Sequence, residues 1–78
     1  MAKEGLNSYK RAYEVIEEGL RKKGEASSIE LLNWLIGNYN INSLNITSKG
    51  ITYHLKKQGY KKYRKYETKP WIFIAEKD

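Results

Sequence analysis

The sequence predicts an α+β fold in which three helices are followed by a two-stranded β-hairpin. Two observations predict it. Apolar residues recur at helical spacing in three separate stretches that end at Leu55. After Gly59 the period changes, and two β-prone runs flank a turn at Glu67–Pro70. The 78 residues correspond to one small domain with a thin core, which leaves little room for a deep enclosed active site.

Residues 8–23 are predicted to form the first helix. Its apolar residues share one face, at Tyr9, Ala12, Tyr13, Ile16 and Leu20. Asn7 or Ser8 can cap the start of this helix, and Gly24 can close its end. Residues 1–7 show no periodicity, so we expect a flexible N-terminal tail there and the folded domain over residues 8–78.

Two shorter helices are predicted next. Residues 25–27 form a connector or a short strand, and Ser27 with Glu30 matches the capping box that begins a helix. This second helix should end near Gly37 or Asn38, and its inward face should carry Ile29, Leu32, Leu35, Ile36 and Tyr39, with Leu31 at the edge. Thr47 or Ser48 should cap a third helix that Gly59 ends, with Ile51, His54 and Leu55 turned inward.

The hairpin is predicted from residues 60–66 and 71–75, which form the two strands. In the first strand, aromatic residues are interleaved among lysine and arginine. In the second, both Trp71/Phe73 and Ile72/Ile74 are apolar, so the alternation of side chains does not decide which pair faces the core.

Positive charge is concentrated in the second half of the chain. The net charge is +6, and residues 1–36 contain equal numbers of basic and acidic residues, so the whole excess lies in residues 37–78. Such a concentration favours binding to a polyanion. Lysines can also protect an edge strand from aggregation, which explains the lysines of the hairpin but not Arg64. No apolar run is long enough to span a membrane and the chain has no cysteine, so we expect a cytoplasmic protein.

The segment Gly50-Ile51-Thr52-Tyr53-His54-Leu55-Lys56-Lys57, with a glycine and a basic hairpin after it, resembles the recognition helix of arsenical-repressor-type regulators. The order of elements is similar to the winged helix-turn-helix superfamily, and short modules in phage and plasmid replication proteins are also similar. The resemblance implies a DNA-binding domain that acts in transcription regulation or in replication of a mobile element. The metal-sensing cysteines of the repressors are missing, so a metal response is not implied.

A winged helix would contact double-stranded DNA with its third helix and its wing. If Ile51 and Leu55 point inward, the opposite face of the third helix meets the major groove. The hairpin adds cations that can neutralise phosphates. The expected DNA-binding residues are Thr47, Ser48, Lys49, Thr52, Tyr53, Lys56, Lys57, Lys61, Lys62, Arg64, Lys65 and Lys69.

Other functions are compatible with the same residues. The hairpin aromatics among basic residues could stack unpaired bases, which would favour single-stranded nucleic acid. The domain could also be a protein-interaction module inside a larger replication or transcription assembly. A homodimer could form through the first helix, with Tyr9, Tyr13 or Leu20.

Enzymatic activity is not expected, because the sequence shows no nucleophile–base pair, no phosphate-binding glycine loop and no metal-ligand spacing. His54 is the single histidine, and we expect it to be packed in the core rather than to bind a metal. We therefore expect no metal, no cofactor and no membrane partner, and a protein associated with the nucleoid.

Overall fold

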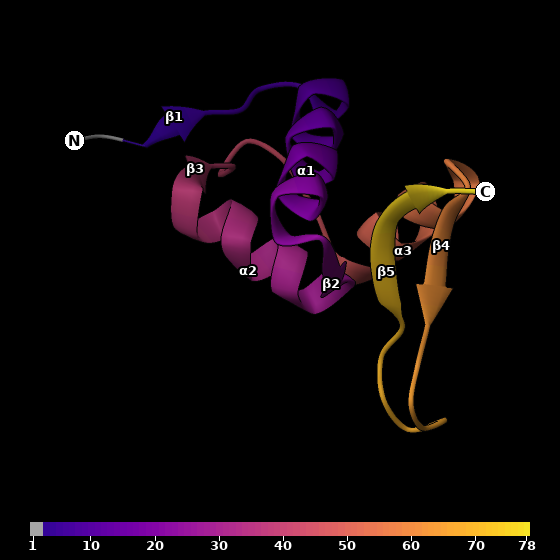
Figure 1. Cartoon of the computed structure of the whole chain (residues 1–78). Helices are drawn as coiled ribbons and strands as arrows, with labels where there is room; N and C mark the ends of the chain where they lie inside the picture. The colour runs from indigo at the N-terminus through magenta and orange to yellow at the C-terminus, as the bar shows by residue number, and fades with distance from the viewer. Residues whose placement is uncertain (1–2) are drawn as a thin grey trace.

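The computed structural model describes residues 3–78, and over that range the chain forms three helices and five strands in an α+β arrangement (Figure 1). In chain order, the elements are β1 (Glu4–Gly5), α1 (Tyr9–Lys23), β2 (Glu25–Ser27), α2 (Ser28–Asn38), β3 (Tyr39–Asn40), α3 (Ser48–Lys57), β4 (Tyr60–Tyr63) and β5 (Ile72–Lys77). None of the helices in residues 3–78 is long and apolar enough to cross a membrane.

Helix α1 confirms the predicted first helix to within one residue. Ser8 is the N-cap by its extended backbone, although its side chain makes no capping hydrogen bond. Gly24 ends the helix with a positive φ of 84°, which a glycine adopts without a steric penalty. The buried residues of α1 are Ala12, Val15, Ile16, Gly19 and Leu20.

Helix α2 begins where the capping pattern predicts, since the Ser27 hydroxyl accepts a hydrogen bond from the Glu30 amide at 3.2 Å. The predicted inward face of this helix is partly wrong. Leu31 and Leu35 are fully buried, whereas Ile29 and Ile36 are 52% and 49% exposed. The spacing of apolar residues fits either face, and packing against α1 and α3 places Leu31 at the centre of the buried face rather than at its edge.

The hairpin belongs to a larger antiparallel sheet in the order β2-β5-β4. The first strand ends at Tyr63 rather than at Tyr66, and the second runs over Ile72–Lys77 rather than over 71–75. Residues 64–71 form the connecting loop, where Pro70 has no amide to donate to a strand partner. On its other edge β5 pairs with β2, and Phe73 lies opposite Ala26.

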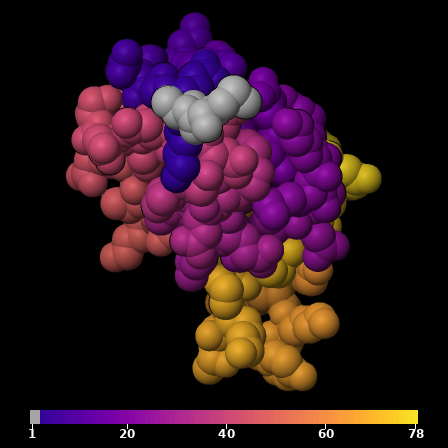
Figure 2. Space-filling model, turned by 90° about the vertical axis from the view of Figure 1, so that its left-hand side faces the viewer, coloured from indigo at the N-terminus to yellow at the C-terminus, as the bar shows by residue number. Residues whose placement is uncertain are grey.

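Within β5, Phe73 is the residue that faces the core. Its side chain is fully buried, while Ile72 and Ile74 are partly exposed. The hairpin loop extends away from the helices and forms a projection from the body of the molecule (Figures 1 and 2).

Part of the predicted N-terminal tail packs against the domain. Glu4–Gly5 pair in parallel with Tyr39–Asn40. Leu6 is only 1% exposed, and its amide donates to the Asn40 carbonyl at 2.9 Å. A two-residue strand has no periodicity to detect in the sequence. Residues 1–2 of the predicted tail lie outside the described residues.

Candidate nucleic-acid interface

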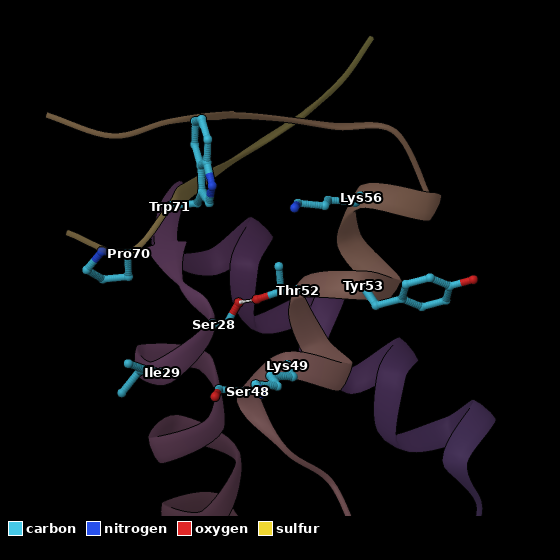
Figure 3. A pocket seen from close by; sticks show the side chains of 9 residues that line it. All are labelled: Ser28, Ile29, Ser48, Lys49, Thr52, Tyr53, Lys56, Pro70 and Trp71. Carbon is cyan, nitrogen blue, oxygen red and sulfur yellow. Dashed lines mark hydrogen bonds between the residues drawn. The ribbon is translucent and has the colours of Figure 1, made fainter. Parts of the chain in front are cut away.

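An open groove of about 400 Å³ separates the outer face of α3 from the base of the hairpin (Figure 3). Residues from α2, α3 and the segment before β5 line it: Ser28, Ile29, Ser48, Lys49, Thr52, Tyr53, Lys56, Pro70 and Trp71. The groove therefore brings together five of the twelve predicted DNA-binding residues, which are Ser48, Lys49, Thr52, Tyr53 and Lys56.

Local sequence and packing fix the face that α3 presents. The Thr47 hydroxyl accepts a hydrogen bond from the Gly50 amide at 3.1 Å, so Thr47 acts as the N-cap. Ile51 and Leu55 are fully buried, which turns Lys49, Tyr53 and Lys56 outward. Gly50 allows close packing of α3 on α1, since a Cβ there would lie 3.0 Å from the Tyr13 hydroxyl.

Thr52 lies at the floor of the groove rather than on its open rim. Its hydroxyl and that of Ser28 form a hydrogen bond, drawn as the dashed line in Figure 3. This bond joins the first turn of α2 to α3. It leaves the Thr52 hydroxyl already paired within the protein, so Lys49, Tyr53 and Lys56 are the side chains of α3 best placed to reach a ligand.

Trp71 forms the hairpin side of the groove, and two cations of the hairpin hold it. The Arg64 guanidinium lies 4.5 Å from the centroid of the Trp71 ring, and the Lys62 ammonium lies 5.4 Å from it. Cation–π attraction of this kind orients both partners. Lys62 and Arg64 thus lie beside the groove, although neither lines it.

The other predicted residues lie away from the groove. Lys61 pairs with Glu76 at 3.6 Å. Lys65 and Lys69 line a second hollow of about 430 Å³, together with Tyr63 and Tyr66. There the Tyr63 hydroxyl donates to Glu25, and this hydrogen bond raises the pKa of Tyr63. Lys57 is exposed at the end of α3, and Thr47 is occupied as its cap.

The inner side of α3 is tied to α1 by His54. Its ring stacks on Tyr13 with centroids 4.6 Å apart, and its Nε2 lies 3.1 Å from the Glu17 carboxylate. The same carboxylate accepts a hydrogen bond from the Tyr60 hydroxyl at 2.6 Å. Burial and then this bond to Glu17 raise the pKa of Tyr60 to about 12. His54 therefore helps to position α3. It lies on the inner side of α3 as predicted, but its side chain is 21% exposed, so it lies at the edge of the core rather than inside it.

The basic residues of this region have few acidic partners. Within residues 3–78, Lys61 is the only lysine or arginine of 49–69 whose side chain lies within 4.0 Å of a carboxylate. By contrast, Arg11 on α1 lies 3.8 Å from Glu14 and 3.7 Å from Glu18. The field of the unpaired cations is consequently available to an anionic ligand.

Ser28, Ile29 and Pro70 line the groove but are not among the DNA-binding residues predicted from the sequence. Ser28 and Ile29 belong to another helix, and nothing in the sequence connects them to α3. The sequence leaves Trp71 either to stacking or to the core, and the structure places it partly exposed at the groove. Of the three candidate dimer residues on α1, Leu20 is fully buried and Tyr13 stacks on His54, while Tyr9 is 48% exposed.

Comparisons with protein-family models, with curated proteins and with solved structures find no match to this chain.

Proposed function

We propose that the protein is a winged-helix domain that binds double-stranded DNA, with α3 in the major groove and the β4–β5 hairpin as the wing. The order α1, β2, α2, α3 and hairpin supports the winged-helix assignment. On this proposal the protein acts in transcription regulation or in replication of a mobile element, at the nucleoid.

One observation carries the proposal: both α3 and the hairpin carry exposed cations that have no acidic partner within residues 3–78. Lys49 and Lys56 lie on α3, and Lys62 and Arg64 lie across the groove. A helix whose inner face is buried can enter the major groove, while a projecting hairpin reaches the phosphate backbone beside it. This distribution supports duplex DNA over a protein partner, for which unpaired charge at the centre of an interface is unfavourable.

The test is the salt dependence of binding to a duplex of mixed sequence, followed by fluorescence anisotropy. About five to seven phosphate contacts would give a slope of about −5 when log K is plotted against log salt concentration. Lys56→Ala should make the slope less steep by about one. The matched control is Lys10→Ala, an exposed lysine on α1, which should leave the slope unchanged. A slope indistinguishable from zero would reject DNA binding and favour the protein-interaction alternative.

A further inference from the structure

We propose that the groove between α3 and the hairpin binds one unstacked nucleobase, so that the protein prefers a duplex carrying a bulged or otherwise unpaired nucleotide. This inference rests on the proposed function and names the form of DNA that the same site would recognise. It follows from the chemistry of the groove walls. One wall offers an aromatic surface, and intact duplex DNA has no free base face to stack on it.

One wall of the groove is apolar and is formed largely by ring side chains. Trp71 and Pro70 stand together on the hairpin side, and Ile29 continues this wall on α2 (Figure 3). A B-form duplex presents phosphates on its outside and only base edges in its grooves. It has no free base face to place against Trp71. An unstacked base has such a face, and stacking on an aromatic side chain is the usual way in which proteins bind it.

The opposite wall supplies donors for the phosphate of the same nucleotide. Ser48, Lys49 and Lys56 line the α3 side, and in Figure 3 the Lys56 ammonium points across the groove towards Trp71. Among the described residues, none that lines this groove is acidic. An apolar wall facing a cationic wall matches a nucleotide, which has a flat ring at one end and an anion at the other.

The apolar wall is also held in place before any ligand arrives. Arg64 lies 4.5 Å from the centroid of the Trp71 ring, which limits its rotation. Ile29 is 52% exposed at the rim, so the core does not account for an isoleucine there. The volume of about 400 Å³ falls within the range of pockets that hold small molecules and can contain a base. A preformed wall reduces the entropy lost on binding.

The test compares three duplexes by fluorescence anisotropy. They share the same paired sequence: one is fully paired, one carries a single bulged adenine, and one carries an abasic nucleotide at the bulge. The adenine bulge should bind about tenfold more tightly than the abasic bulge, because the two differ only in the base that stacks. Trp71→Leu should bring this ratio close to one. Tyr66→Leu, the matched aromatic change elsewhere on the hairpin, should leave it at about tenfold.

Ile29→Asn provides a second variant at an exposed position, should Trp71→Leu impair folding, and it should lower the ratio at least threefold. Equal binding of adenine and abasic bulges by the unmodified protein would overturn the inference, as would a ratio unaffected by both Trp71→Leu and Ile29→Asn. The fully paired duplex reports separately on the proposed function. Salt-dependent binding to that duplex without a preference for adenine would reject the base site and retain DNA binding.

Discussion

At the scale of single residues, Glu17 connects the inner face of α3 to the rest of the domain. Its carboxylate is shared by His54 of α3 and Tyr60 of β4, and Lys77 of β5 lies 4.0 Å away. Burial raises the pKa of Glu17, but the hydrogen bonds from Tyr60 and His54 and the electrostatic effects of His54 and Lys77 outweigh it. The pKa of Glu17 therefore lies below its ordinary value of 4.5.

This shift predicts how stability depends on pH. Because the folded pKa is lowered, the ionised carboxylate contributes stability that is present above pH 4.5 and is lost as the pH falls through the folded pKa. Glu17→Gln should therefore lower the free energy of unfolding near neutral pH and reduce its decrease between about pH 6 and pH 3. Urea unfolding at several pH values measures both effects.

Glu18→Gln is the matched control for this experiment, because the Glu18 side chain on the same helix is 43% exposed, against 16% for Glu17, and pairs only with Arg11 among the residues described. It should leave the pH dependence close to that of the unmodified protein. If the Glu17 and Glu18 variants lose stability in parallel as the pH falls, the Glu17 network does not supply the expected pH-dependent stabilisation.

At the scale of elements, α3 and the hairpin present different chemistry to a ligand. Lys49 and Tyr53 project from a helix whose other side is fully buried, so packing fixes their positions. Arg64, Lys65 and Lys69 lie in a loop that projects from the body of the molecule, visible as the orange-to-yellow segment in Figure 2. A rigid helix suits the reading of base edges, whereas a projecting loop suits contact with phosphates.

Substitutions in these two elements should therefore affect DNA binding differently. Replacing Arg64, Lys65 and Lys69 with alanine should weaken binding to every duplex by a similar factor and lower the salt slope by about one for each phosphate that is no longer neutralised. Replacing Lys49 and Tyr53 with alanine should cost about 1–3 kcal/mol on a preferred site and much less on random DNA. Selection from a random duplex pool, followed by titration of the selected and random sequences, measures both.

The reverse result would reassign the roles of the two elements. If the hairpin variants lose sequence preference while the helix variants weaken all duplexes equally, the hairpin reads the bases and α3 contacts the backbone. Thr52→Ala adds an internal comparison, since its hydroxyl is already bonded to Ser28. Loss of stability without loss of sequence preference is the outcome expected for that variant.

At the scale of the whole molecule, the small core depends on contacts between distant parts of the chain. The sheet joins β2 to β5, although Ala26 and Phe73 are far apart in sequence. At the other end of the domain, Leu6 belongs to the buried core, and the Ser43 hydroxyl donates to its carbonyl at 3.3 Å. A domain of this size has little stability to spare, so each such contact matters.

Leu6→Ala should accordingly lower the free energy of unfolding by about 2–5 kcal/mol, the usual loss for a fully buried leucine. Its neighbour Asn7 is exposed, so Asn7→Ala should change stability by less than about 0.5 kcal/mol. Urea denaturation of the two variants gives the comparison. A Leu6 variant as stable as the Asn7 variant would mean that the N-terminal segment contributes nothing to the core, as the sequence-based prediction of a tail implies.

Features that depend on neighbouring residues follow from the sequence alone. Helix starts at Ser27 and Thr47 and helix ends at Gly24 and Gly59 are predicted closely, because capping and positive φ involve residues a few positions apart. The outward face of α3 is likewise predicted from the spacing of Ile51 and Leu55, and both residues are fully buried. The concentration of positive charge needs no structure to be seen.

Features that depend on which distant segments meet come from the tertiary structure. On α2, Leu31 rather than Ile29 faces the core of the domain. Both residues satisfy helical spacing, and only packing against other elements distinguishes them. Leu6 is buried because a two-residue strand finds its partner in β3. The groove likewise requires Ile29, Lys56 and Trp71 from three separate segments. Local rules cannot place these side chains together, because the free energy that does so comes from burial shared across the whole core.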